Sequence, residues 1–449
     1  MERQLTRDLS NIKLDAYTPS RIELALRALV LAAIFAPVIL LAPLALISSW
    51  FRILVWYALL RRTLGNAGVA FIKWAQWSST RNDMFPAELC RELGQLRHSA
   101  PCHSASYSRK LVERAVGQKL EGYFEAFSER SIASGSIAQV HRATLHGLSV
   151  AVKVRHPGVV EHIATDFAIM QGLAALVSSL GLLRWFDLEE TVKQFSAVIG
   201  QQTQLQTEAL HLRMCIRNFA AWPDCIFPRP LLATADVIIE SFEPGRHVSD
   251  FTGVCELISI FPLYLYSPVG HADIDIYLKM LLQDNLMHAD LHPGNLLVRN
   301  HDGDKPAMIL VDLGMVAILS KDEQRNYLGL LHAMGSGDGI FILIYFWTPP
   351  DLQPLDRENF EIEMDALFLK VCRGYGTAPD FGEVVRGVLT AVRNHRVRIG
   401  PNYMTLIINA LCLDAMARTL QPSYSTLDAA RPLLQFHKRV PGQVSPKEN

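Results

Sequence analysis

The sequence has no excess of either charge and no long basic run, and this argues against a large class of functions. Its 43 lysine and arginine residues are matched by 44 aspartate and glutamate residues, which gives a formal net charge of -1. Nonspecific binding to nucleic acid depends on basic side chains that replace the counterions of the phosphate backbone. We therefore expect no nucleic-acid partner.

Cysteine is sparse as well. Seven cysteines are scattered over 449 residues, and no two of them form a C-x-x-C pair. A disulfide framework uses an even set of cysteines at regular spacing, and a zinc knuckle uses close pairs. Neither is predicted, and the thiols are expected to be reduced.

Charged residues are missing from one stretch near the start, ALVLAAIFAPVILLAPLALISSWF at residues 28–51. A helix of about twenty apolar residues is long enough to cross the core of a bilayer. Pro37 and Pro43 would kink it, and such kinks are tolerated in membranes where neighbouring groups satisfy the freed carbonyls. The stretch predicts a single membrane-spanning helix, with a buried or re-entrant apolar helix as the alternative. Arginines flank both sides, so the orientation is not predicted.

Next comes FIKWAQWSSTRNDMFP, in which Lys73 and Gln76 recur at the spacing of one helix face. The segment SIASGSIAQVHRATLHGLSVAVKVRHPG then predicts two strands joined by a turn at His146-Gly147. Lys153 stands inside the apolar strand, where an ammonium group needs a partner. Glu208, on a long predicted helix further along the chain, is a plausible one.

A loop of small residues precedes the two strands, and small residues allow backbone amides to approach a phosphate closely. Its members are Ala133, Ser134, Gly135 and Ser136. Further on, CIFPRPLLATADVIIESFEPG predicts two more strands that end at the segment 242–245, Phe-Glu-Pro-Gly. Such a break is typical of a linker, and we expect a hinge between lobes there.

The stretch MHADLHPGNLLV, residues 287–298, allows two interpretations. His288, Asp290 and His292 could form a metal cage, since His and Asp clusters bind zinc and other metals. Alternatively, Asp290-x4-Asn295 has the spacing of the catalytic loop of a kinase. The metal cage would require further ligands downstream, and no comparable cluster of His or carboxylate residues occurs there.

Phosphoryl transfer requires a lysine on the phosphates, a glutamate that holds it, an aspartate near the acceptor, and an Asn and an Asp for magnesium. All five occur here in kinase order. VAVK stands where the kinase Val-Ala-Ile-Lys would stand, and Asp312-Leu-Gly stands where Asp-Phe-Gly would. Each motif alone is a weak signal, but the ordered set favours a kinase-like enzyme with structural roles for the two histidines.

With these motifs the chain resembles the UbiB/aarF family of atypical protein-kinase-like proteins, from about residue 65 to about residue 430. The motifs that carry the resemblance are SIAQVHRA with VAVKVRHPG, MHADLHPGNLLV, ILVDLGMVAIL, and LCLDAMARTLQPSY near the C-terminus. Within the family, KWAQWSSTRNDMFP makes the chain most similar to the aarF-domain-containing kinase 2 type. The resemblance implies an α+β, two-lobed protein-kinase-like fold with a helical N-terminal extension over the active site and an N-terminal transmembrane helix.

The resemblance also assigns roles by position. Lys153 would contact the phosphates of ATP, Glu208 would pair with Lys153, and Asp290 would be the catalytic aspartate. Asn295 and Asp312 would hold Mg²⁺. The small-residue loop 133–136, Glu240 and Phe242 would contribute to the nucleotide site.

Regulatory positions are implied too, and here the chain departs from the family pattern. The Lys-x-Gly-Gln motif is Lys73-Trp-Ala-Gln76, which lacks the glycine. The Glu-x-Asp motif is Gln202-Thr-Gln204, in which neutral amides replace both acids. We predict that these changes alter regulation while leaving the phosphate and magnesium residues intact.

These motifs divide the chain into six expected segments. They are an N-terminal segment (1–27), a hydrophobic membrane segment (28–60), a helical extension (61–130), an N-lobe with a helical insertion (131–243), a C-lobe (244–436) and a tail (437–449).

The implied function is that of a kinase-like ATPase or phosphotransferase in ubiquinone (coenzyme Q) or related lipid metabolism. The expected location is a mitochondrial membrane, specifically the inner membrane, which one helix of the chain would cross once. Expected partners are membrane lipid, proteins of the coenzyme Q pathway, and a small-molecule or lipid substrate, with a protein substrate doubtful. Two alternatives stay open: a weakly catalytic nucleotide-sensing scaffold, and a small-molecule phosphotransferase of the choline or aminoglycoside kinase type.

Overall fold

The structure is a computed structural model, and it describes residues 17–79, 85–96, 102–179, 188–248, 272–291, 293–299, 307–337, 357–372 and 380–395, together with single positions such as 374 and 407. The chain divides into two compact units. The first unit comprises residues 1–245 and 309–315, and the second comprises residues 246–308 and 316–449. The boundary at Gly245 falls at the end of the segment where the sequence predicts a hinge.

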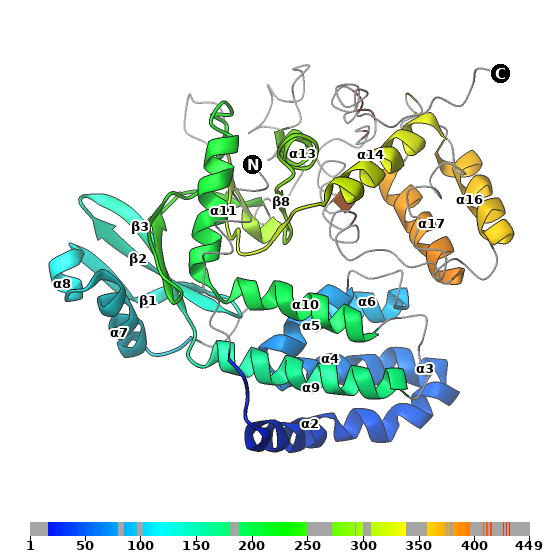
Figure 1. The fold of residues 1–449 in the computed structure, drawn as a ribbon, viewed down its shortest axis with the longest axis horizontal. Helices are drawn as coiled ribbons and strands as arrows, with labels where there is room; N and C mark the ends of the chain where they lie inside the picture. Colours follow the sequence, from blue (N-terminus) through cyan, green and yellow to red (C-terminus); the bar gives the residue numbers. More distant parts are fainter. Residues whose placement is uncertain are drawn as a thin grey trace. The chain divides into compact units, whose positions relative to one another are not determined.

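The first unit contains a five-stranded antiparallel sheet with the strand order β1-β2-β3-β6-β5 (Figure 1). Its strands are β1 (Ala126–Ser134), β2 (Ala138–Leu145), β3 (Leu148–Arg155), β5 (Pro230–Ala233) and β6 (Val237–Ser241). β2 and β3 form the predicted hairpin, and its turn at His146 and Gly147 has φ angles of 52° and 74°. Positive φ at both central residues suits the right-handed twist of a hairpin. The predicted turn is confirmed.

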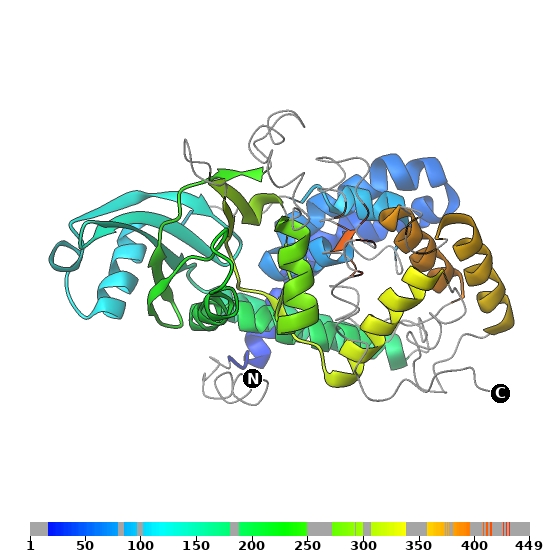
Figure 2. The same ribbon diagram turned by 90° about the horizontal axis from the view of Figure 1, so that it is seen from above.

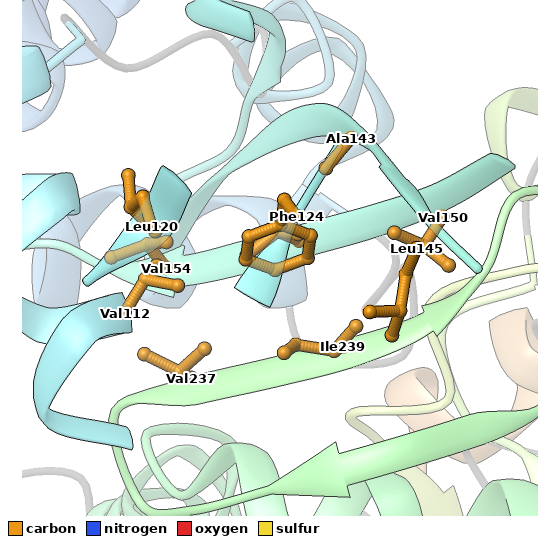
Figure 3. Packing of buried hydrophobic residues seen from close by; sticks show 10 residues of the cluster. Val112, Leu120, Phe124, Ala143, Leu145, Val150, Val154, Val237 and Ile239 are labelled. Carbon is orange, nitrogen blue, oxygen red and sulfur yellow. The ribbon is translucent and has the colours of Figure 1, made fainter. Parts of the chain in front are cut away.

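One face of this sheet is apolar and carries one of the hydrophobic clusters of the first unit (Figure 3). Val150, Val152 and Val154 alternate along β3 and are almost fully buried. They pack with side chains from β6 and from two helices, α7 (Ala105–Val116) and α8 (Leu120–Tyr123). Because successive side chains of a strand point to opposite faces, Ala151 and Lys153 point to the other side of the sheet.

Helices make up the rest of the first unit. After β3 come α9 (Val159–Ser179), α10 (Leu188–Gln202) and α11 (Leu205–Asn218), and α11 packs against β5 and β6. The short strand β4 (Cys225–Ile226) follows. Seen from above, the cyan elements around the sheet and the blue N-terminal helices form separate parts of this unit (Figure 2).

The N-terminal helices form a bundle with α9 and α10. They are α2 (Arg21–Ile47), α3 (Ser49–Phe51), the π-helical turn η1 (Arg52–Trp56), α4 (Tyr57–Ala67), α5 (Val69–Ser79) and α6 (Ala87–Leu93). α2 lies alongside α4 and α9 and buries Leu31, Val38 and Ala45, which recur every seventh residue.

α2 confirms the apolar helix predicted from residues 28–51, although it begins earlier, at Arg21. Ser20 caps its start in a capping box with Glu23, whose carboxylate accepts a hydrogen bond from the Ser20 amide. Among the described residues, two helices are long and apolar enough to cross a membrane by length and composition, α2 and α9.

A buried ion pair ties α2 to the bundle. The Arg27 guanidinium donates to Asp166 of α9, with an Nε to Oδ1 distance of 2.6 Å and an Nη2 to Oδ2 distance of 3.0 Å. Arg27 also donates to the carbonyl oxygen of Ala67, the last residue of α4. Asp166 is only 1% exposed, so its charge depends on this partner.

The second unit is mixed in its secondary structure. Its helical segments are α13 (Ala272–Lys279), η4 (Met280–Asp284), η5 (Pro293–Asn295), α14 (Lys321–Ser336), α16 (Arg357–Val371) and α17 (Phe381–Asn394). Its strands are β7 (Arg246–His247), β8 (Met287–His288), β9 (Leu296–Arg299) and β11 (Val316–Ala317), while β10 (Ala307–Leu310) runs across the boundary between the units. β7 pairs with β9, and β11 pairs with β8, both antiparallel.

We predict that Arg27→Met lowers the free energy of unfolding by about 3 kcal/mol, because it leaves the buried Asp166 carboxylate without its cation. Chemical denaturation would measure the loss. The exposed pair of Arg325 with Asp322 supplies the control, and Arg325→Met should change stability by less than about 1 kcal/mol. Adding Asp166→Leu to Arg27→Met should restore most of the loss. An Arg27→Met protein as stable as wild type would contradict the assignment.

Candidate functional site

Lys153 stands at the centre of a charged cluster in the first unit. Its Nζ atom lies 2.9 Å from both Oε1 and Oε2 of Glu208 and 3.0 Å from Oδ1 of Asp312. The Lys153 side chain is 16% exposed and that of Glu208 is 4% exposed, whereas the Asp312 side chain is 50% exposed. The structure therefore brings together three predicted site residues that are widely separated in the sequence.

Local structure explains how these side chains meet. The alternation of β3 buries its valines on the core face and presents Lys153 on the opposite face. On α11, Glu208 and His211 are three residues apart and lie on one side of the helix. His211 is buried, and its Nδ1 lies 2.9 Å from the carbonyl oxygen of Leu313, which fixes the residue after Asp312. α11 thus holds both Lys153 and the segment that carries Asp312.

Asp312 has a φ angle of 60°, in the left-handed region that residues other than glycine seldom adopt. Aspartate tolerates this region better than most residues do. Gly314 follows closely, and a Cβ atom there would lie 3.4 Å from Oδ1 of Asp312. The Asp-Leu-Gly sequence therefore suits a tight turn that carries a carboxylate.

The cluster has an excess of negative charge. Burial alone would lower the pKa of Lys153, but Asp312, Glu208 and Glu240 outweigh burial and raise it. Burial also raises the pKa of Glu208, and the ion pair with Lys153 opposes that rise. The lysine is accordingly held as a cation among carboxylates.

Glu240 belongs to the same face of the sheet. In the register of β3 and β6, Ala151 is opposite Glu240 and Lys153 is opposite Ile238. Burial and the neighbouring Glu208 raise the pKa of Glu240 to about 8. Among the described residues, no group donates a hydrogen bond to its buried Oε2 atom.

Phe242, which directly follows β6, is also predicted for the nucleotide site, and its ring packs against a cation. The guanidinium of Arg142 lies over its ring, with 4.6 Å between the Cζ atom and the ring centroid. The amide of Phe242 donates to the carbonyl oxygen of Ser149 on β3. Its role in binding a nucleotide stays a prediction.

The small-residue loop lies where β1 turns into β2, with Ala133 and Ser134 at the end of β1. The Gly135 amide donates to the carbonyl oxygen of Ala138 at 2.9 Å. The Gly135 carbonyl oxygen lies 3.0 Å from Nε2 of His156. The Gly135 amide therefore closes the turn, and a contact of this loop with phosphates stays a prediction.

His156 belongs to a partly buried polar network that sequence reasoning missed. Its Nδ1 lies 2.7 Å from Nδ1 of His103, and Nε2 of His103 lies 2.8 Å from Oγ of Ser108 on α7. The same Ser108 Oγ lies 2.9 Å from Nε2 of His141 and 3.1 Å from Nε2 of Gln139. The network thus connects α7 and β2 to the small-residue loop.

A signal for this network was present in the sequence. Gln139 and His141 of SIAQVHRA are two residues apart on β2, and both lie on its core-facing side. Polar residues at inward positions of a strand require buried partners. The pattern shows that partners exist, but it does not show that they are His103 and Ser108.

Lys73 and Gln76 lie on α5, as the helical spacing predicted. Trp74 and Trp77 of α5 pack in a cluster with α9, α10 and Met315. Met315 immediately follows the Asp312-Leu313-Gly314 turn, so the extension lies beside this part of the site within the first unit. Its proposed regulatory role stays a prediction.

Gln202 and Gln204 lie at the junction of α10 and α11, one turn before Glu208. Their side chains are 9% and 2% exposed. Among the described residues, neither Oε1 atom accepts a hydrogen bond. A buried amide oxygen without a hydrogen-bond donor costs free energy. The neighbouring residues therefore leave the two amide oxygens of this junction without the donors that they need.

Asp290 and Asn295 belong to the second unit. The Asn295 side chain donates to the carbonyl oxygen of Asp290 at 3.0 Å and is buried. The Asp290 amide donates to Nδ1 of His288 at 3.1 Å. This hydrogen bond occupies Nδ1 of His288 and supports a structural role for that histidine.

The metal-cage interpretation is tested only in part, because His292 lies outside the described residues. Within the described part of the chain, no group of three or more His, Cys, Asp or Glu side chains could hold a metal ion alone. A magnesium ion shared with phosphates needs fewer protein ligands, all with hard oxygen atoms. The half-exposed carboxylate of Asp312 fits that requirement.

The sheet, the lysine held by a helix glutamate, and the aspartate in an Asp-Leu-Gly turn define a class of protein. They are the features of the N-terminal half of a protein-kinase-like domain. Residues 95–342 match the model of the ABC1 atypical kinase-like domain. The chain therefore belongs to this family.

Curated relatives agree with this assignment. A probable serine/threonine-protein kinase, abkC, of Dictyostelium discoideum is 28% identical over 92% of this chain and 69% of its own length. A mitochondrial ABC1 family protein of Saccharomyces cerevisiae is 28% identical over 91% of this chain and 74% of its own length. The probable protein kinase UbiB of Histophilus somni is 28% identical over 84% of this chain and 70% of its own length.

Solved structures show weaker similarity. A complex of Rv3197 with erythromycin from Mycobacterium tuberculosis is 20% identical, with a TM-score of 0.43, over 78% of this chain and 91% of that chain. Rio2 kinase from Chaetomium thermophilum, with ADP and Mg²⁺, is 12% identical, with a TM-score of 0.30, over 82% of this chain and 96% of that chain.

The histidine network predicts sensitivity to acid. Burial, together with His156 and His141, lowers the pKa of His103 to about 4, below its ordinary value of about 6.5. Below pH 6.5 the unfolded chain binds a proton that the folded chain does not, so stability should fall from about pH 6.5 towards pH 4. Denaturant titrations at several pH values would measure this fall.

His103→Asn should be less stable than wild type at pH 7.5 but lose less stability on acidification. The matched control is His146→Asn, because His146 is exposed and its positive φ suits asparagine. It should keep the wild-type pH dependence. If His103→Asn retained the full acid sensitivity, the network would not be its source.

Proposed function

We propose that the chain binds ATP and Mg²⁺ and acts as an ATPase or phosphotransferase in mitochondrial coenzyme Q or lipid metabolism. The observation that supports this most is the contact of Lys153 with Glu208 and Asp312. A lysine held by a glutamate of an adjacent helix, beside an Asp-Leu-Gly aspartate, is the arrangement that kinase-like proteins use on nucleotide phosphates.

Each residue has a proposed task. Lys153 binds the phosphates, and Glu208 holds its ammonium in place. Asp312 and Asn295 are the proposed ligands of Mg²⁺, which would offset the negative charge of the phosphates. Asp290 orients the acceptor, a hydroxyl group or water. Positioning and electrostatics of this kind supply most of the catalysis in phosphoryl transfer.

The nucleotide base is proposed to lie against the face of the sheet that carries Ala151 and Glu240. Burial and the neighbouring Glu208 raise the pKa of Glu240, which favours a protonated side chain that can donate a hydrogen bond to an acceptor. The small-residue loop 133–136 lies at the other end of β3, beside its last residues, and would cover the phosphates.

A small-molecule or lipid acceptor is favoured over a protein. The α5 extension packs beside the residue that follows the Asp312 turn, and such a cover limits access for a large substrate. We propose low protein kinase activity for this reason. Proteins of the coenzyme Q pathway are the proposed partners.

The proposed location is the inner mitochondrial membrane. The relatives with mitochondrial names and the apolar α2 support a mitochondrial, membrane-attached protein. The sequence predicts that α2 crosses the membrane once. The packing of α2 against α4 supports an alternative, in which the chain is attached to the membrane from one side without crossing it.

Steady-state ATP hydrolysis, measured with and without phospholipid vesicles, tests the proposal directly. Turnover that requires Mg²⁺ would support an enzyme. Nucleotide binding without turnover under any lipid condition would instead favour a nucleotide-sensing scaffold. Absence of nucleotide binding would overturn the proposal.

We predict that Asp312→Asn weakens Mg²⁺-ATP binding by at least about tenfold, because magnesium prefers anionic oxygen ligands. Thermal-shift titration with Mg²⁺-ATP measures the effect. Asp322→Asn, at an exposed position of α14, is the matched control and should bind as wild type does. An Asp312→Asn protein with the wild-type shift would rule out this metal ligand.

We also predict that Gln202→Glu combined with Gln204→Asp changes the affinity for Mg²⁺-ATP. The new carboxylates would be buried one turn before Glu208, where an added negative charge competes for nearby cations. Isothermal titration compares this variant with Gln201→Glu, which adds one charge at an exposed position of the same helix. Identical affinities in both variants and wild type would remove this junction from the nucleotide site.

A further inference from the structure

The N-terminal helices form an antiparallel hairpin. α2 is the outward leg, the chain turns at Ser48, and α3, η1 and α4 form the return leg. Hydrogen bonds connect the two legs at three successive levels. Arg27 donates to the Ala67 carbonyl oxygen, Trp56 Nε1 donates to that of Val38 at 2.9 Å, and Arg52 donates to that of Ala45 at 3.2 Å.

The closed end of this hairpin exposes large apolar side chains. Leu46, Ile47 and Trp50, around the turn, are 81%, 85% and 67% exposed. Further exposed apolar side chains continue along both legs at Ile39, Leu40, Leu44, Ile53, Leu54 and Val55. A continuous apolar patch of this kind on a folded protein marks a surface that binds an apolar partner. We call residues 38–56 the hairpin tip.

Ser48 and Arg52 of the tip have hydrogen-bond partners within the hairpin itself. The Ser48 amide donates to the Leu44 carbonyl oxygen, and the Ser48 hydroxyl accepts from the Phe51 amide. The Arg52 side chain donates to the Ala45 carbonyl oxygen, one of the last carbonyls of α2. Internal partners are what a turn requires in hydrocarbon, because no water is present to satisfy the backbone.

We propose that the hairpin tip inserts into a lipid bilayer from one side, so that the chain is attached without crossing the membrane. The inference rests on the membrane attachment in the proposed function and specifies its geometry. A chain that enters with α2 returns with α4, and both open ends of the hairpin stay on the same side.

The open end of the hairpin is fixed to polar structure. Arg27 joins α2 to Ala67 of α4 and to the buried Asp166 of α9. Arg61 of α4 pairs with Glu92 of α6 at 2.7 Å. A crossing by α2 alone would separate it from α4 and leave the Asp166 carboxylate buried without a cation, which is costly.

The depth of the tip agrees with partial insertion. From residue 38 to residue 47, α2 rises about 14 Å. The hydrocarbon core of a bilayer is roughly 30 Å thick. The tip therefore reaches about the middle of the bilayer, while the charged pairs of the open end stay outside it.

A bilayer suits the tip better than a second protein does. The exposed tip side chains are almost all aliphatic, and the side chains of Ser48 and Arg52 have partners inside the hairpin. Protein interfaces combine an apolar core with a polar rim and about one hydrogen bond per 100–200 Å². The tip offers very little for such a rim.

The test adds full-length protein to preformed phosphatidylcholine vesicles. Flotation measures binding, and a membrane-impermeant maleimide then labels single cysteines introduced at three exposed positions, Thr18, Ser49 and Asn66. Mass spectrometry quantifies the label at each position. Thr18 and Asn66 report the two open ends of the hairpin, and Ser49 reports the tip.

One-sided insertion predicts that Thr18→Cys and Asn66→Cys are both labelled from outside, whereas Ser49→Cys is labelled only after detergent is added. Labelling at only one of positions 18 and 66 would show a crossing and overturn the hairpin geometry alone. Labelling of Ser49→Cys in floated protein without detergent would also overturn it. Failure to float would contradict the proposed membrane attachment itself, and nucleotide binding would be unaffected by any of these results.

A paired variant tests the tip as the inserted surface. Leu46→Glu with Ile47→Glu should lower the floated fraction by about tenfold or more, because carboxylates are costly in hydrocarbon. Both positions are exposed, so the fold should survive, and nucleotide binding serves as the check. Leu231→Glu, on the exposed edge strand β5, is the control and should float as wild type does. If the variant with Leu46→Glu and Ile47→Glu floated as well as Leu231→Glu, the proposal would be overturned.

Discussion

The ion pair between Lys153 and Glu208 is the constraint on which the site depends. An ammonium group on the inner part of a sheet is stable only when a carboxylate replaces the water that it has lost. Glu208 supplies that carboxylate with both oxygen atoms, from a helix that also holds the Leu313 carbonyl through His211. The position of α11 thereby sets the positions of Lys153 and Asp312 together. Movement of that helix would separate the lysine from the segment that is proposed to bind magnesium.

Buried polar groups recur elsewhere in the first unit, and each has a comparable structural effect. Arg27 and Asp166 hold α2 to α9 and to the end of α4. The histidine network holds α7 to the loop before β2. Such contacts are directional, and the loss of one partner leaves the other polar group buried and unpaired, which costs free energy. They therefore restrict the positions of helices more than apolar packing does. In this chain they fix the N-terminal helices to α9, and α7 to the loop between β1 and β2.

The sequence predicted the parts of the fold that are encoded locally. The alternation of LSVAVKV predicted β3 with Lys153 on one face, and His146-Gly147 predicted the turn before it. The partner Glu208 was a plausible assignment from the order of motifs, and the structure confirms the contact. The order of motifs assigned Asp312 to the same site as Lys153, although 159 residues separate the two positions, and the structure adds the direct contact between them.

Contacts between distant residues without a recognised motif could not be predicted. The sequence of α9 does not indicate that Asp166 pairs with Arg27. Arg27 is 139 residues away and lies at the edge of an apolar run. The apolar composition of residues 28–51 predicted a helix suited to a membrane. It did not predict that the helix would fold back against α4, because hydropathy describes each residue alone. The use of the Gly135 amide within its own turn was likewise invisible in the sequence.

Lys153 is proposed to contact the phosphates of a bound nucleotide, and this contact can be measured directly. An ATP analogue with an acyl phosphate at its terminal phosphate transfers the acyl group to whichever lysine lies beside that phosphate, and peptide mass spectrometry locates the label. Acylation is expected at Lys153 and should be suppressed by excess Mg²⁺-ATP, and the labelling should be lost in Glu208→Gln. Labelling spread over other lysines, or labelling of Lys153 that Mg²⁺-ATP does not reduce, would contradict the proposed contact.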